Sequence, residues 1–130
     1  MKGITTNVFK KIIRTKWNLS VATTIDLLSS KWKVLIMRDL LKGTRRYSEL
    51  RTSVAGISQK MLTQSLQEMT DDGLVIRKAF PVIPPKVEYH LSELGESMRP
   101  IINSMADWGS DYLDHHPEKR RVTMQPTPAQ

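Results

Sequence analysis

Apolar residues return every three or four positions along the first half of the chain. This spacing predicts two helices, one from about residue 20 to 28 and one from about 31 to 41. Ser29 and Ser30 lie between them, and either can cap the start of the second helix. The preceding stretch, residues 1–18, is basic and only weakly amphipathic, so its pattern favours a helix only slightly.

Two further helices follow, separated by a tight turn. A short helix is predicted to begin near Tyr47, and a longer one to run from about 59 to 71. Gly56 lies in the turn, and Ser58 is the expected N-cap of the longer helix. The apolar residues of that helix form one stripe, which leaves a separate polar face. Two helices joined in this way are typical of a helix-turn-helix.

A β-hairpin is predicted directly after the fourth helix. Residues 74–80 are rich in β-formers, and residues 86–91 alternate between apolar and polar. Residues 81–85 include three prolines, which cannot donate ladder hydrogen bonds, so they form the loop at the hairpin tip. The expected fold is therefore mainly α with a small β-hairpin, a winged helix-turn-helix.

A long helix is predicted to follow, from about 93 to 114, with Ser92 as its N-cap. Its apolar residues recur with a period of about 3.5, which is typical of a helix that packs along another helix. Pro100 lies inside this run. It predicts a bend, because its ring nitrogen cannot donate to the carbonyl of Glu96.

Composition sets the class of protein. A chain of 130 residues suits one domain, and the absence of cysteine excludes disulfides, thiol catalysis and cysteine metal sites. No apolar run approaches the roughly 18 residues of a membrane span, and no signal peptide opens the chain, so a cytoplasmic protein is expected. The expected parts are a basic N-terminal extension (1–18), the winged domain with its flanking helices (19–114) and a flexible basic tail (115–130).

Charge is distributed unevenly along the chain, whose net charge is +7 with a pI near 9.9. Residues 31–91 carry a net +5, whereas residues 92–118 carry a net −5. A basic middle followed by an acidic helix predicts one face that meets a polyanion such as DNA. Ordinary solvated surface charge is the alternative explanation.

The helix at 59–71 fits the geometry of DNA reading. The major groove is about 12 Å wide and admits one α-helix, whose polar side chains can meet base edges. Gln64 can make the paired contact of an amide with adenine, and Thr63 can meet base edges or a thymine methyl. Basic residues of the hairpin suit the DNA backbone or the minor groove. The candidate DNA-binding residues are Arg46, Ser58, Gln59, Lys60, Thr63, Gln64, Arg77, Lys78 and Lys86.

Several segments resemble the HxlR-type winged helix-turn-helix transcriptional regulators, which are related to the MarR-like group. The most specific are Arg46-Tyr47-Ser48-Glu49-Leu50 and Pro84-Pro85-Lys86-Val87-Glu88-Tyr89. The resemblance covers about residues 19–113 and implies a bacterial or archaeal, nucleoid-associated homodimer that binds an inverted-repeat operator in double-stranded DNA. It also implies that the first and last helices form the dimer interface, for which the candidates are Val21, Ile25, Leu28, Met98, Ile101, Met105, Trp108 and Tyr112.

The chain departs from this family at one place that matters for regulation. Members often carry a Cys-Pro pair just before the first helix, and some use that thiol to sense oxidants or electrophiles. Leu19 and Ser20 stand at the corresponding position here. Sensing by a thiol is therefore excluded.

Other functions find less support. The chain has no Walker loop, GxGxxG, HExxH or nucleophile elbow, so no enzyme, cofactor or metal is expected. His115 and His116 are adjacent and suit a helix C-terminus better than a chelate. His90 has only Glu88 as a neighbour on its strand face, too few ligands for a metal.

Two alternatives stay open beside DNA regulation by a homodimer. One is a winged-helix module that binds proteins without binding DNA. Another is an interfacial binder that uses residues 7–17 as a basic amphipathic helix. A small-molecule effector is not identified, and the residues that would line its pocket are favoured as plain core: Met98, Met105, Trp108 and Trp32.

Overall fold

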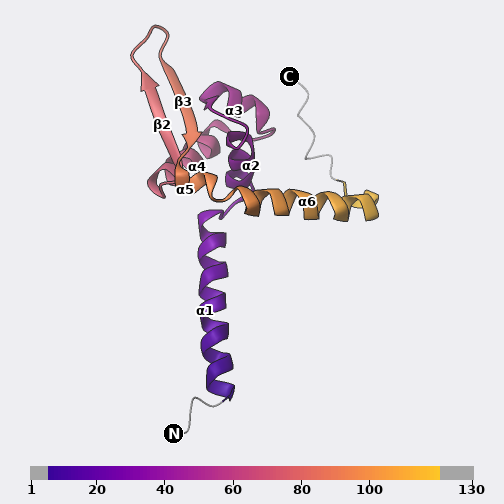
Figure 1. The fold of residues 1–130 in the computed structure, drawn as a ribbon. Helices are drawn as coiled ribbons and strands as arrows, with labels where there is room; N and C mark the ends of the chain where they lie inside the picture. Colours follow the sequence, from indigo (N-terminus) through magenta and orange to yellow (C-terminus); the bar gives the residue numbers. More distant parts are fainter. Residues whose placement is uncertain (1–5, 121–130) are drawn as a thin grey trace.

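The computed structural model describes residues 6–120, with side chains from residue 15 onward. Two long helices extend away from a body that holds the remaining elements (Figure 1). The helices are α1 (Thr6–Leu27), α2 (Lys31–Leu40), α3 (Tyr47–Ser53), α4 (Gln59–Asp71), α5 (Glu93–Glu96), α6 (Arg99–His115) and the short 3-10 helix η1 (Pro117–Lys119). The strands are β1 (Arg45–Arg46), β2 (Val75–Phe80) and β3 (Lys86–Leu91).

Serine side chains begin three of the helices, as the sequence predicts. The hydroxyl oxygen of Ser30 accepts from the backbone N–H of Lys33 at 3.3 Å, which selects Ser30 over Ser29 as the N-cap of α2. Ser58 and Ser92 cap α4 and α5 in the same way, each with a 3.1 Å bond. Each cap satisfies a backbone donor that the first helical turn leaves without a partner.

The sheet has the order β1-β3-β2 with antiparallel neighbours. The short strand β1, which the sequence did not predict, pairs Arg46 with Glu88 and Arg45 with Tyr89 of β3. Tyr89 and Leu91 are buried, and Glu88 points to the opposite, outer face. The predicted alternation of β3 is confirmed, and β1 ties the start of α3 to the hairpin.

The core lies between α2, α4 and the base of the hairpin. α2 and α4 each place their apolar stripe inward, which is why both were readable from the sequence. Each fully buried leucine or isoleucine stabilises the fold by about 1.5–3 kcal/mol. The apolar core residues that are at most 2% exposed are Ile36, Met37, Leu40, Leu50, Val54, Leu62, Leu66, Met69, Leu74 and Val75.

α1 is one continuous helix, and this extends the prediction of a helix that begins near residue 20. Serine and threonine hydroxyls in it donate to carbonyls one turn back, such as Ser20 to Lys16 and Thr23 to Leu19. Only its C-terminal end lies against the body (Figure 1). A helix that does not pack along a core needs no apolar stripe, which agrees with the weak pattern in the first half of its sequence. The boundary expected at residue 18 falls inside this helix.

The single long helix predicted from 93 to 114 is wrong at its start. The chain forms α5, breaks at Ser97 and Met98, and restarts as α6. Pro100 lies in the first turn of α6, where a missing N–H has no helical partner to lose, so it begins a helix instead of bending one. Arg99 donates to the carbonyl of Leu41 at 3.0 Å and fixes where α6 leaves the body.

A close approach joins α5 to the start of the hairpin. A Cβ added at Gly95 would lie 2.2 Å from the carbonyl oxygen of Leu74, so no side chain fits there. The Ser92 hydroxyl also donates to the carbonyls of Gly73 and Leu74. The base of the hairpin is therefore bound to the segment that leads into α6.

A candidate nucleic-acid interface

The outward side of α4 is a continuous polar surface. The helix buries Leu62, Ser65, Leu66 and Met69, and the side chains on its opposite side face solvent. We call this surface the polar face of α4; it consists of Gln59, Lys60, Thr63, Gln64 and Gln67, all exposed. The structure thus brings together four of the candidate DNA-binding residues on one helix, with the exposed Ser58 at its N-terminus.

Tyr47 supports this face from α3. Its hydroxyl lies 2.9 Å from the Thr63 hydroxyl and donates to the Gln59 carbonyl at 3.2 Å. Thr63 is therefore held at its oxygen, which leaves its methyl group as its other contact surface. Sequence reasoning missed this role, because no helical or strand spacing relates Tyr47 to a residue on another helix.

An ion pair fixes the other edge of the polar face. The Lys33 ammonium of α2 lies 2.6 Å from Glu68 Oε2 on α4, and the Gln64 amide donates to Glu68 Oε1 at 3.0 Å. The hydrogen bonds from Lys33 and Gln64 and the Lys33 charge lower the pKa of Glu68. The lysine side chain is only 6 % exposed, and its nitrogen also donates to Ser29 Oγ at 3.2 Å. Sequence reasoning missed this pair as well.

The outer face of the sheet gathers three cations around one carboxylate. The pairing register places Arg46 of β1 and Lys78 of β2 on either side of Glu88. Lys86 Nζ lies 2.9 Å from Glu88 Oε1. The Lys86 hydrogen bond lowers the pKa of Glu88, with the charges of Lys86, Arg46 and Lys78 acting in the same direction. Both lysines also lie over the Phe80 ring.

Arg77 does not join this cluster. It pairs with Tyr89 across β2 and β3 and so projects from the opposite face of the sheet, although it is exposed. Glu49 accepts from the backbone N–H of Arg46 at 2.9 Å, which leaves the Arg46 guanidinium exposed beside the hairpin. The wing candidates therefore divide into a cluster of three, Arg46, Lys78 and Lys86, and a separate Arg77.

A polar helix face beside a basic hairpin is the arrangement of a DNA reader, and comparison with known proteins agrees. A family model described as HxlR-like helix-turn-helix matches residues 27–117. The chain belongs to this family. The family consists of transcriptional regulators, so the predicted DNA-binding regulator of this type is confirmed, and so is the prediction that the chain is not an enzyme.

Individual relatives support the same assignment. The chain is 41% identical over 99 residues to the HTH-type transcriptional regulator YtcD of Bacillus subtilis, covering 76% of this chain and 79% of YtcD. It is 48% identical over 81 residues to the regulator YtfH of Escherichia coli K12, covering 62% and 64%. The reduced form of the redox regulator HypR superposes with a TM-score of 0.72 at 36% identity, covering 76% of this chain and 98% of HypR.

The comparison with HypR bears on how this chain could be regulated. HypR is described as a redox regulator in oxidised and reduced forms. The present chain contains no cysteine. A thiol switch is therefore outside its chemistry, whatever signal it uses.

Apolar side chains remain exposed on the two long helices. Ile25 of α1 is 60% exposed and Trp108 of α6 is 70% exposed. We call the exposed set the apolar helix surface; it consists of Val21, Ile25, Ile101, Met105, Trp108 and Tyr112. Two further exposed residues of α1, Trp17 and Leu19, were not among the dimer-interface candidates.

Two candidates for the dimer interface lie elsewhere. Met98 is only 6% exposed and belongs to the core of the body, because it sits in the break where the chain turns from α5 into α6. Leu28, just past the end of α1, is partly buried against the same core. Both residues thus pack against the core of their own chain.

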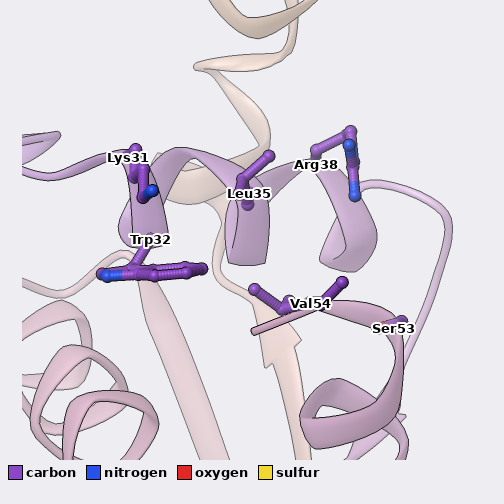
Figure 2. Close-up of a pocket in the computed structure, with 7 residues that line it drawn as sticks. Lys31, Trp32, Leu35, Arg38, Ser53 and Val54 are labelled. Atoms are coloured by element: carbon purple, nitrogen blue, oxygen red, sulfur yellow. The ribbon is translucent and has the colours of Figure 1, made fainter. Parts of the chain in front are cut away.

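A small pocket opens between α2 and the end of α3 (Figure 2). Its volume is about 60 Å³. Figure 2 shows the Trp32 ring lying flat at one end below Lys31, whose ammonium is 4.6 Å from the ring centroid. Of the residues weighed for an effector pocket, Trp32 lines this one, whereas Met98, Met105 and Trp108 do not. Trp32 also packs against the core, as predicted.

The described residues include no group of three or more His, Asp or Glu side chains placed to hold a metal ion. His115 and His116 each direct Nδ1 at a carbonyl four residues back, at 2.8 and 3.0 Å. None of the described helices is long and apolar enough to span a bilayer.

Proposed function

We propose that the protein binds a palindromic operator as a homodimer, with α4 of each protomer in the major groove. The observation that carries this proposal is the fully exposed polar face of α4 on a helix whose other side is locked into the core. One α-helix fits the major groove, and such a face places several side chains against base edges. A homodimer on chromosomal DNA also implies a cytoplasmic, nucleoid-associated protein.

The polar face divides into reading and anchoring groups. Gln64 presents an amide to the bases, and Thr63, held by Tyr47, presents a methyl suited to thymine. Lys60 suits guanine or a phosphate, and Gln59 lies beside it near the helix start. Ser58 and the free N–H groups of the first turn of α4 suit a phosphate.

The three-stranded sheet supplies the second contact with each half-site. Arg46, Lys78 and Lys86 form one cationic cluster, which suits adjacent phosphates of one strand. Glu88 reduces the charge of this cluster and holds Lys86 in place. Arg77, on the other face of the hairpin, suits a separate backbone or minor-groove contact.

The apolar helix surface supports the homodimer. Exposed tryptophan, isoleucine and methionine side chains grouped on two helices are typical of a protein–protein contact. A two-fold pair would place two α4 helices in successive major grooves, with half-site centres about 34–36 Å apart.

Titration of the full chain against its selected operator and against scrambled DNA, at several salt concentrations, tests the proposal. Gln64→Ala is expected to relax selection at one or two positions, at a cost of roughly 1–3 kcal/mol. Lys78→Ala is expected to weaken all DNA binding and to flatten the salt slope by about one unit. Lys119→Ala, on the short helix η1 after α6, is the control and should change neither quantity.

Two results would overturn parts of this proposal. Unchanged discrimination by Gln64→Ala would remove that residue from base reading. A dimer without salt-sensitive binding to any duplex would instead support a protein-interaction module.

A further inference from the structure

Gln64 is connected to the interior of the protein through one carboxylate. Its Nε2 donates to Glu68 Oε1 at 3.0 Å, and Glu68 Oε2 lies 2.6 Å from Lys33 Nζ. The lysine is buried, and Ser29 Oγ, 3.2 Å away, is its second partner. A side chain on the polar face of α4 is thus joined to the junction of α1 and α2.

The buried lysine explains why Glu68 stays in place. An ammonium removed from water without a partner is strongly unfavourable, so Lys33 keeps the carboxylate against it. The same contact neutralises a negative charge that would otherwise lie on a surface facing phosphates. A glutamate with the ordinary pKa of 4.5 is ionised at neutral pH, and the contacts of Glu68 lower its pKa further.

An ionised carboxylate accepts hydrogen bonds and donates none. The Gln64 amide must therefore direct its nitrogen toward Glu68. A flip of the amide would bring Gln64 Oε1 against the carboxylate, so that two hydrogen-bond acceptors would face each other. One orientation of the amide is selected before any DNA is bound.

We propose that the Lys33–Glu68 pair fixes the hydrogen-bonding sense of Gln64, so that its carbonyl oxygen meets an exocyclic amino group in the major groove. Adenine N6 and cytosine N4 are such groups, whereas guanine O6 and thymine O4 are acceptors. Glu68 is then a positioning residue that determines specificity, although it reads no base itself. This inference rests on the proposed function.

The neighbouring pair on α4 provides a matched control. Gln67 Nε2 donates to Asp71 Oδ1 at 2.9 Å, with the same four-residue spacing. No bond from a buried lysine holds Asp71 among the described contacts. Asp71→Ala therefore removes an equivalent carboxylate, and one negative charge, without touching Lys33 or Gln64.

The test uses the full chain and four operators that differ only at the base pair relaxed by Gln64→Ala. The wild type is expected to bind operators with adenine or cytosine on the contacted strand about tenfold more tightly than those with guanine or thymine. The double variant Lys33→Met/Glu68→Ala should reduce this ratio to within about twofold while keeping its affinity for the best operator. Asp71→Ala should keep the wild-type ratio.

The double variant avoids leaving an unpaired ammonium in the core, and Lys33→Met alone gives a second measure. With its anchor lost, Glu68 holds Gln64 less firmly, so Lys33→Met should show a ratio between the wild type and the double variant. Thermal unfolding confirms that each variant is folded.

Two results would overturn the inference. One is a double variant that keeps the wild-type ratio; the other is a wild type that prefers guanine or thymine. Both leave the proposed function intact, since binding and the effect of Gln64→Ala persist. Absence of salt-dependent duplex binding by the wild type overturns the proposed function itself, and this inference with it.

Discussion

The DNA-binding body and the two long helices differ in how far their side chains are buried and hydrogen-bonded within the chain. In the body, Ile36, Met37 and Leu62 have no exposed surface, and the buried charges Lys33 and Asp39 both have partners. No buried side-chain nitrogen or oxygen among the described residues lacks a hydrogen bond. α1 and α6, by contrast, leave tryptophan, isoleucine and methionine in solvent.

Under the proposed homodimer, this difference separates what one chain completes by itself from what a second copy would cover. The body has a closed core and satisfied polar groups, so its stability depends on its own packing. The apolar helix surface has no such closure, and Figure 1 shows both helices leaving the body in different directions. Substitutions in the body should therefore lower the free energy of unfolding, and substitutions in the apolar helix surface should lower dimerisation.

The largest effect is expected from breaking the apolar helix surface. Trp108→Glu places a charge at its most exposed aromatic residue and should yield a monomer, whereas the wild type is expected to be the proposed dimer. Operator affinity should then fall by about 10²–10⁴-fold, because the second half-site no longer benefits from being linked to the first. Light scattering with size-exclusion chromatography and operator titration measure both quantities. Ile76→Glu, at an exposed apolar residue of β2, is the control and should leave the molar mass measured in solution equal to that of the wild type.

A truncation in the body tests the other half of the comparison. Leu66→Ala removes a buried side chain of α4 and should lower the free energy of unfolding by about 2–5 kcal/mol. Met105→Ala on α6 starts from an exposed side chain and should cost the isolated fold almost nothing. Both are measured by chemical denaturation in the Trp108→Glu background, which is expected to be monomeric, so that dimer contacts do not contribute to the measured stability. Equal losses would show that the two regions form one core.

A smaller effect is expected where the body supports the polar face of α4. Tyr47→Phe removes the hydroxyl that contacts Thr63 and Gln59 and should cost about 1 kcal/mol of stability. It should also weaken selection at the base pair met by Thr63. Thr63→Val removes the other hydroxyl, and the double variant should cost less than the sum of the single changes. Strict additivity would mean that the two hydroxyls act independently.

The smallest expected effect is a change in how stability depends on pH. The lowered pKa of Glu68 means that its contribution is complete above the ordinary value of 4.5 and is lost as pH falls through the lowered value. The wild type should therefore lose more stability than Lys33→Met between about pH 5 and 3. Denaturation curves across that range measure the difference, and parallel losses would contradict a coupled pair.

Elements with a strong internal period were readable from the sequence. The stripes of α2 and α4, the alternation of β3 and the prolines of the hairpin tip each mark their element without reference to the rest of the fold. The predicted serine caps also match. Local pattern was enough because each of these elements packs one face against the same core.

Features that depend on contacts between elements were not readable. The run of apolar residues after Ser92 continues across the break at Met98, so spacing alone could not separate α5 from α6. β1 has two residues and exists only through its pairing with β3. The supports of the polar face, Tyr47 and the Lys33–Glu68 pair, join residues on different helices, which no periodicity relates.

The contact of Gly95 with Leu74 has a mechanical consequence for a pair of protomers. Since no methyl group fits between α5 and the base of the hairpin, their backbones pack directly against each other. In the proposed homodimer, a tilt of one α6 against its counterpart would be expected to shift the base of the hairpin with it. The span between the two wings, and hence the operator spacing they tolerate, would be set at the far end of the molecule from the bases.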